Sequence, residues 1–201
     1  MEQERSAEKI DLDKFDNKLI EGLCNYNRFI PLYSEIDEES SEEVNNKIKV
    51  FNWKDPKLAI ILEINSCGGN CVDGLSIIDA IISSPAPVVT IITGMAASMA
   101  SLISVVGAKR LITPNAFWMA HPMTATASDY LPYMKDHFAF LNVLNNRMEE
   151  VYKKYTKLLK ADYARFYNGE LWLTAEECMK KGIVDGILNT KKQGTVEFWV
   201  N

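Results

Sequence analysis

Several features that mark other classes of protein are scarce or missing in this sequence. No run of about 18 apolar residues occurs, so a membrane span is not expected. The acidic opening residues are not followed by the apolar stretch of a secretion signal. Lysine and arginine total 22 against 27 acidic residues, a net charge of −5. We therefore do not expect the basic face of a nucleic-acid-binding protein.

Metal-binding patterns are also missing. The sequence has only two histidines, His121 and His137, and its four cysteines form no CxxC pair: Cys24, Cys67, Cys71 and Cys178. No histidine lies close to the Cys67/Cys71 pair, so a zinc site is not expected. Reduced thiols are the expected state, which fits a cytoplasmic protein.

A candidate nucleophile stands in the most uniformly apolar part of the chain. A buried strand is predicted over 88–93; at Gly94 the pattern changes to small residues and then to a buried helix. Ser98 lies at the start of that helix, where free backbone N–H groups suit a developing oxyanion. The same position suits a serine that merely caps the helix. This stretch does not by itself decide between the two.

Two further strand ends carry groups that such a serine would need. Gly68 and Gly69 follow the apolar run 58–64, and His121 follows the short run 116–119. If these three strand ends converge, they bring together a nucleophile, a base and a loop of oxyanion donors. We therefore predict a serine-based catalytic site, which needs no cofactor and no metal.

The rest of the chain alternates between strand and helix patterns. Strands are predicted over 28–33, 58–64, 88–93, 110–113 and 116–119, with a final strand or turn over 183–187. Helices are predicted over 15–24, 42–52 (capped by Ser41), 73–83, 128–158, 159–169 and 174–182, with a turn at Trp172. This alternation predicts a parallel, layered α/β architecture in one domain.

The helix over 128–158 is unusually long, about 45 Å at the standard rise. Its apolar positions recur on one side over the whole length: Leu131, Met134, Phe138, Leu141, Leu144, Met148, Val151, Tyr155 and Leu158. It is either a core-covering helix with an overhanging end or an arm that packs against another subunit.

We expect a mobile segment over 1–14, a main domain over 15–190 and a tail over 191–201 to which the sequence assigns no role.

Five segments in order resemble the Clp-type serine peptidases (the ClpP family), within the wider crotonase-like superfold. They are Asn27-Arg28-Phe29-Ile30-Pro31-Leu32, Ile64-Asn65-Ser66-Cys67-Gly68-Gly69, Gly94-Met95-Ala96-Ala97-Ser98-Met99-Ala100, Pro114 through His121, and Leu173 through Asp185. The resemblance covers roughly residues 10–190. It implies a layered α/β fold with repeated strand–helix units and a protruding handle helix, the handle region spanning about 122–158.

The resemblance also assigns roles to residues. Ser98 matches the nucleophile and His121 the base, while Glu170 stands where the family usually has aspartate. Backbone N–H groups of Gly69 and Met99 match the oxyanion hole. An extended substrate would pair as an added strand along 68–72 and 122–125, with contacts at Gly68, Asn70, Cys71, Pro122, Met123 and Thr124.

Besides Glu170, two further features depart from the family pattern. Cys67 replaces the usual proline before the two glycines, and 122–127 contains no glycine where the family is glycine-rich. The handle region is therefore altered, which makes this a divergent member.

The resemblance predicts an ATP-dependent serine endopeptidase that degrades unfolded polypeptides inside a homo-oligomeric ring. The ring would be heptameric, single or double. An AAA+ unfoldase ATPase would feed it, because this chain has no P-loop, and residues 1–14 would gate its axial pore. Two alternatives stay open: a catalytically weak or inactive ring subunit, and an acyl-CoA enzyme of the crotonase type.

Overall fold

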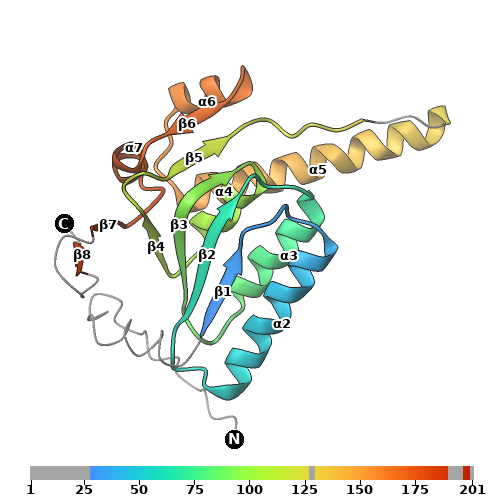
Figure 1. The fold of residues 1–201 in the computed structure, drawn as a ribbon. Coiled ribbons are helices and arrows are strands. Elements are labelled where there is room, and N and C mark those ends of the chain that lie inside the picture. Colours follow the sequence, from blue (N-terminus) through green and yellow to red (C-terminus); the bar gives the residue numbers. More distant parts are fainter. Residues whose placement is uncertain (1–27, 127–129, 190–196, 200–201) are drawn as a thin grey trace, which may run out of the picture.

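The computed structural model describes residues 28–126, 130–189 and 197–199 (Figure 1). The predicted mobile segment 1–14 and the helix over 15–24 lie outside these ranges. The strands are β1 Phe29–Leu32, β2 Ile60–Ser66, β3 Val88–Ala97, β4 Lys109–Ile112, β5 Phe117–Ala120, β6 Leu171–Leu173, β7 Gly186–Asn189 and β8 Glu197–Trp199. The helices are α2 Glu38–Lys54, α3 Cys71–Ile82, α4 Met99–Val105, α5 Leu131–Tyr155, α6 Lys160–Tyr167 and α7 Ala175–Lys180.

The described strands form one mainly parallel sheet. Its path is β1-β2-β3-β4-β7-β8, and β5 pairs with both β3 and β6. Pairing is parallel except between β5 and β6 and between β7 and β8. The predicted parallel, layered α/β architecture is confirmed.

The two short strands after α4 pair with β3 rather than with each other. The first half of β3 pairs with β4 and the second half, Met95–Ala97, pairs with Phe117–Met119 of β5. As a result β3 has different neighbours at its two ends, and its C-terminal end lies beside the end of β5. This arrangement places the residues after both strands close together.

Strand β3 is longer than predicted. It continues through Gly94 to Ala97, and the break comes at Ser98. The register with β2 is interrupted between Ile64 and Ser66, and there the Asn65 side-chain oxygen accepts the Met95 N–H at 3.1 Å. A side chain thus satisfies the backbone at the irregularity, so the strand does not have to end at the glycine.

The sheet is buried on both faces, as the non-alternating run before the glycines predicted. Ile60, Leu62 and Ile64 belong to the main core with the helices, whereas Ile61 belongs to a smaller cluster on the other face. The smaller cluster contains Ala59, Ile61, Val89, Ile91, Leu111 and Leu188.

Two helices begin earlier than predicted, and in the first of them the cap is another residue than Ser41. Helix α2 starts at Glu38, since Asp37 accepts the Ser40 N–H at 2.8 Å and Ser40 Oγ accepts the Asp37 N–H at 2.9 Å. Ser41 is therefore inside the helix rather than its cap. Helix α3 starts at Cys71, where Asn70 accepts the N–H groups of the second and third helical residues.

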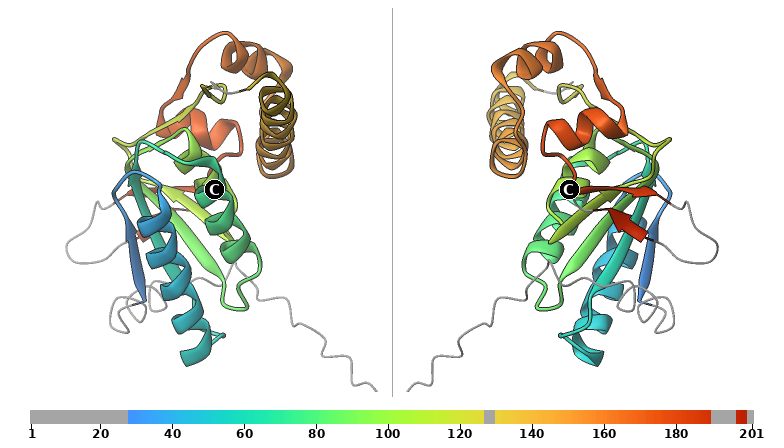
Figure 2. Two further views of the ribbon diagram at one scale, coloured as in Figure 1. Left: turned by 90° about the vertical axis from the view of Figure 1, so that its right-hand side faces the viewer. Right: turned by 90° about the vertical axis from the view of Figure 1, so that its left-hand side faces the viewer.

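Helix α5 protrudes from the layered body along its N-terminal half (Figure 1) and is seen nearly end-on in Figure 2. Its buried residues, Leu144, Met148 and Tyr152, all lie in the C-terminal half. The predicted apolar stripe is buried only there, because Leu131 and Phe138 are 67% and 54% exposed. The overhanging end is thus observed. Tyr152, which is outside the predicted stripe, is buried, while Tyr155 is partly buried against the main core.

One prediction near the C-terminus was wrong. Trp172 does not start a turn but lies in β6, paired with Met119 of β5. In the tail, Glu197–Trp199 forms β8 on the edge of β7. Local sequence did not predict β6, since its pairing edge is supplied by β5, a distant segment. None of the helices in the described ranges is both long and apolar enough to cross a membrane.

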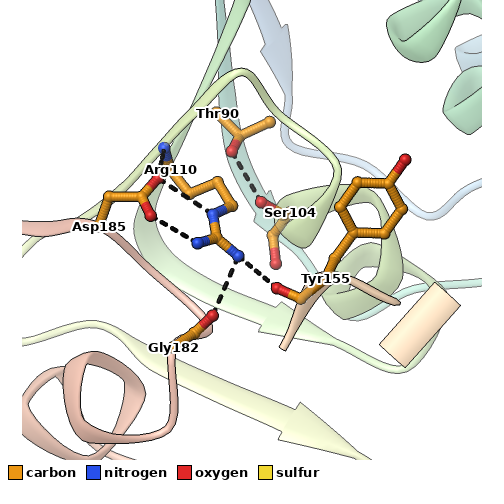
Figure 3. A network of polar contacts seen from close by, with 6 residues as sticks. All are labelled: Thr90, Ser104, Arg110, Tyr155, Gly182 and Asp185. Atoms are coloured by element: carbon orange, nitrogen blue, oxygen red, sulfur yellow. Dashed lines mark hydrogen bonds and ion pairs between the residues drawn. The ribbon is translucent and has the colours of Figure 1, made fainter. Parts of the chain in front are cut away.

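Arg110 fastens the C-terminal end of α5 to the sheet (Figure 3). Its guanidinium donates to the carbonyls of Tyr155 and Gly182, at 2.5 and 3.0 Å, and forms an ion pair with Asp185. The Asp185 carboxylate also accepts the Arg110 backbone N–H at 2.9 Å. One partly buried side chain therefore joins β4, the last turn of α5 and the segment between α7 and β7.

Replacing Arg110 with alanine is expected to lower the free energy of unfolding by about 2–3 kcal/mol, because several charge-assisted hydrogen bonds are lost and Asp185 remains unpaired. Urea unfolding at matched protomer concentration measures this. The control is Lys47→Ala, which breaks the exposed Lys47–Glu43 pair and should change stability by no more than about 0.5 kcal/mol. Equal effects of the two substitutions would contradict the assigned role of Arg110.

Candidate active site

Ser98 stands at a strained turn between β3 and α4. Its φ is 53° and its ψ −122°, and in the described ranges no other residue except glycine has a positive φ. Its side chain makes no capping hydrogen bond although it occupies the N-cap position. The alternative of a simple capping serine therefore does not apply. A non-glycine residue held in this conformation costs about 1–3 kcal/mol and marks a site where the surroundings impose it.

The neighbouring strand holds this turn in place. The Ser98 backbone N–H donates to the Met119 carbonyl of β5 at 2.9 Å, continuing the pairing of the two strands. The side chains of Ala96, Ala97 and Ala100 around it are small and buried. A sharp strand-to-helix turn of this kind leaves a serine hydroxyl exposed for attack.

The loop with the two glycines packs directly on the serine. A Cβ built on Gly68 would lie 2.7 Å from the Ala97 carbonyl oxygen, 2.7 Å from Ser98 Cβ and 2.9 Å from the Met99 nitrogen. The φ of Gly68 is +97°. Both the lack of space and the backbone conformation require glycine here.

Gly69 presents a free backbone edge. Ile36 hydrogen-bonds to the residues before and after Gly69. Its N–H donates to the Gly68 carbonyl at 2.8 Å, and its carbonyl accepts the Asn70 N–H at 2.7 Å. Among the described residues no partner accepts the Gly69 N–H. The Met99 N–H, first in α4, likewise has no acceptor within its helix. Both are therefore available as the predicted oxyanion donors.

His121 follows β5 by one residue and is partly buried. Its Nδ1 lies 2.7 Å from the Pro122 carbonyl oxygen. A carbonyl only accepts, so Nδ1 carries a proton, and in the neutral form of the ring Nε2 is then an acceptor. This is the tautomer that a base removing a serine proton requires.

Glu170 lies where the register of the sheet brings it opposite His121. Ala120 of β5 pairs with Leu171 of β6, and one further step along this antiparallel pair sets His121 against Glu170. The exposed carboxylate nevertheless accepts the Trp172 indole N–H at 2.7 Å. Among the described residues, no hydrogen bond joins Ser98 to His121 or His121 to Glu170. Continuing the β5–β6 register sets His121 opposite Glu170, while the side chains of these two residues have other partners.

The predicted substrate-binding edges are only partly extended. Asn70 uses its side chain to cap α3, and Cys71 already belongs to that helix, so the edge expected over 68–72 ends at Asn70. Pro122 and Met123 follow β5 without regular structure and are partly buried, while Thr124 is exposed. Met123 packs against the main core.

Two of the cysteine thiols, Cys71 and Cys178, are poor nucleophiles. Burial raises the pKa of the Cys71 thiol, which disfavours its reactive thiolate. Burial, with a contribution from Glu177 and Glu176, raises the pKa of Cys178 to about 12. The second histidine, His137, is exposed on α5.

Three residues that the sequence analysis did not select also bear on the site. Asn65 supports the irregularity in β3, and Ser101 and Tyr152 form a buried hydrogen bond beside Ser98. Asn65 lay within a motif segment and could have been found there. Ser101 and Tyr152 are 51 residues apart, and no local pattern connects them.

A strained serine at a strand end, packed against a Gly-Gly loop, places the chain among serine hydrolases with a layered α/β fold. Residues 16–191 match the family described as Clp protease, and the chain belongs to that family. The predicted family, fold and enzyme class, a Clp-type serine peptidase, are confirmed at this level.

The chain is similar over most of its length to proteins named as ATP-dependent Clp protease proteolytic subunits. ATP-dependent Clp protease proteolytic subunit 1 of Chlamydia pneumoniae is 31% identical over 161 residues, 76% of this chain and 82% of the relative. Subunit 3 of Streptomyces coelicolor is 30% identical over 179 residues, 88% and 82% of the two chains. Subunit 1 of Leifsonia xyli is 32% identical over 166 residues, 80% and 82%.

Proposed function

We propose that this chain is the proteolytic subunit of an ATP-dependent Clp-type peptidase and that Ser98 is its nucleophile. The observation that carries the proposal is the Ser98 turn, with its positive φ, its uncapped side chain and its contact with Gly68. Strain of this kind persists where function requires it.

In the proposed reaction, His121 Nε2 takes the Ser98 Oγ proton as the oxygen attacks a peptide carbonyl. The N–H groups of Gly69 and Met99 stabilise the oxyanion of the tetrahedral intermediate. His121 then gives the proton to the leaving amine, which leaves an acyl-enzyme on Ser98. Water, deprotonated by His121, releases the second product and restores the serine.

We assign Glu170 to the third position of the triad. The register opposite His121 supports this, and a small side-chain rotation away from Trp172 would free the carboxylate. Glutamate in this position would orient the imidazole and stabilise its protonated form. In the present conformation the Pro122 carbonyl holds His121 Nδ1.

Replacing Glu170 with glutamine is expected to lower kcat by about 100- to 10,000-fold, because the group that stabilises the imidazolium is lost. Hydrolysis of a fluorogenic peptide measures this. Trp172→Phe is the matched variant, since it removes the competing indole donor and keeps a ring; it should retain or raise kcat. Activity of Glu170→Gln within about threefold of wild type would remove Glu170 from the triad and leave the Pro122 carbonyl as the orienting group.

The proposed substrates are unfolded polypeptides bound as an added strand. The free edge at Gly69 and the segment Pro122–Thr124 support this mode, with contacts from Gly68, Asn70 and Cys71. Binding through main-chain hydrogen bonds depends little on the side chains of the substrate. We therefore expect broad selectivity and, without a partner, cleavage of short peptides only.

We further propose a homo-oligomeric ring, heptameric and single or double, that works with an AAA+ unfoldase in the cytoplasm. The protruding half of α5 supports assembly, because it carries a set of large exposed apolar residues: Leu131, Tyr133, Phe138, Phe140 and Val143. The names of the relatives support dependence on an ATPase. Native mass spectrometry of the full chain tests the ring size.

Fluorophosphonate labelling tests the central proposal. An activated serine should take up one label per protomer, detected by intact mass, and the assembled protein should cleave a short fluorogenic peptide. The alternative of an inactive ring subunit is favoured by one observation: among the described residues, no hydrogen bond joins Ser98 to His121. Assembled rings that neither label nor cleave would establish that alternative. Thermal protection by an acyl-CoA would instead favour the crotonase-type reading.

A further inference from the structure

Tyr152, on the helix that forms the arm, is connected to the nucleophile by two buried hydrogen bonds. Its hydroxyl lies 2.7 Å from Ser101 Oγ, and Ser101 Oγ donates to the Ser98 carbonyl at 2.5 Å. Tyr152 is 2% exposed and Ser101 is fully buried. The Ser98 carbonyl also accepts the Ser101 backbone N–H at 3.0 Å.

The directions of these bonds follow from the available protons. The Ser98 carbonyl can only accept, so the single Ser101 hydroxyl proton goes to it. The Tyr152 hydroxyl must then donate to Ser101 Oγ. Burial raises the pKa of Tyr152, so that proton is present at neutral pH. The result is a chain of donors from Tyr152 through Ser101 to the carbonyl of the strained residue.

The tyrosine ring is itself fixed by neighbouring aromatic rings. It makes edge-on contacts with Trp118 of β5 and Phe166 of α6, with centroids 5.7 and 5.9 Å apart. The Trp118 indole N–H donates to the Ser101 carbonyl at 3.3 Å. The hydroxyl of Tyr152 thus reaches Ser101 from a rigid position.

We infer that Tyr152 and Ser101 are positioning residues that hold the oxyanion hole. The Ser98 carbonyl and the Met99 N–H belong to one planar, trans peptide group, so fixing the carbonyl also fixes the direction of the N–H. Met99 N–H is a donor that the proposed reaction uses, and this inference rests on that proposed function. The strained φ of Ser98 needs such over-determination to persist.

Replacing Tyr152 with phenylalanine removes the hydroxyl and keeps the ring contacts. We expect kcat to fall about tenfold with KM changed less than twofold, because a misdirected donor weakens transition-state stabilisation and not substrate binding. A peptide aldehyde, whose adduct with Ser98 places an oxyanion in the hole, should lose affinity by the same factor as kcat/KM. A purely structural role would not link these two quantities.

Two further variants sharpen the test. Ser101→Ala breaks the same chain without touching the aromatic rings, and it decides the matter if Tyr152→Phe fails to fold. The double variant should be no worse than Ser101→Ala, since both act through one bond. The control is Tyr155→Phe, one turn along α5, whose hydroxyl points away from the Arg110 contacts in Figure 3. The kcat, KM and aldehyde affinity of this control should equal those of wild type.

The outcomes separate this inference from the proposed function. If wild type cleaves and Tyr152→Phe and Ser101→Ala both behave as Tyr155→Phe does, the positioning role is wrong. If wild type neither labels nor cleaves, the proposed function fails. A crystal structure of Ser101→Ala then decides the inference: a rotated Ser98–Met99 peptide supports it, and an unchanged peptide overturns it.

Discussion

Replacing Ser98 with alanine is expected to abolish fluorophosphonate labelling and to lower peptide hydrolysis by at least about 10,000-fold. The substitution removes the nucleophilic oxygen and leaves the strand pairing and the glycine loop unchanged. Initial rates on a fluorogenic peptide and intact mass after labelling measure the two effects. Ser83→Ala, an exposed serine at the end of α3, is the control and should label and cleave as wild type does.

The same position offers a test of strain that does not depend on activity. Ser98→Gly should also be inactive, but it should be more stable than Ser98→Ala by about 1 kcal/mol, because glycine accepts the positive φ of 53° without a Cβ clash. Urea unfolding of the two variants at equal concentration measures the difference. Peptide hydrolysis at the wild-type rate in either variant would exclude Ser98 as the nucleophile. Equal stability would contradict a strained turn.

Replacing Gly68 with alanine is expected to lower kcat by about 100- to 1,000-fold, an effect of the size seen when an oxyanion donor is lost. The new methyl group would lie 2.7 Å from both the Ala97 carbonyl oxygen and Ser98 Cβ. The first is a backbone atom and the second belongs to the strained Ser98 turn, so neither can shift without a cost in free energy. The glycine loop and Ser98 must therefore move apart. The measurements are kcat on the peptide and the rate of labelling.

Gly169→Ala is the matched control for this loop substitution. A Cβ at Gly169 meets no atom within 4 Å, so activity and stability should remain close to wild type. A wild-type labelling rate in Gly68→Ala would show that the glycine loop does not set the position of Ser98. The proposed oxyanion role of Gly69 would then lose its support.

Much of this protein could be predicted from the sequence because the relevant signals are local. Apolar, β-branched runs and helical periodicity predicted most of the described strands and helices to within a few residues. The order of the short motifs gave the family and the candidate residues Ser98, His121 and Gly69. The protruding arm was also predictable, since the length of the apolar pattern on α5 exceeds what one sheet can cover.

Predictions failed where a distant segment supplies the partner. Strand β3 runs past Gly94 because Asn65 and β5 satisfy its backbone, and Trp172 lies in a strand because β5 offers an edge. The start of α2 was misplaced for a different reason. Two competing caps, Asp37 and Ser41, lie within one turn, and only the observed geometry separates them.

The sequence by itself determined the class of protein, the order of its elements and the identity of the candidate nucleophile, base and oxyanion glycine, because these depend on residue type and short-range spacing. The tertiary structure decided the rest: the strain at Ser98, the bond between Glu170 and Trp172, and the link from Tyr152 through Ser101 to the Ser98 carbonyl. The strain at Ser98 and the link to Tyr152 depend on strand register and side-chain packing between distant segments, and the Glu170–Trp172 bond depends on the pairing of β6 with β5. Short-range patterns do not encode these pairings.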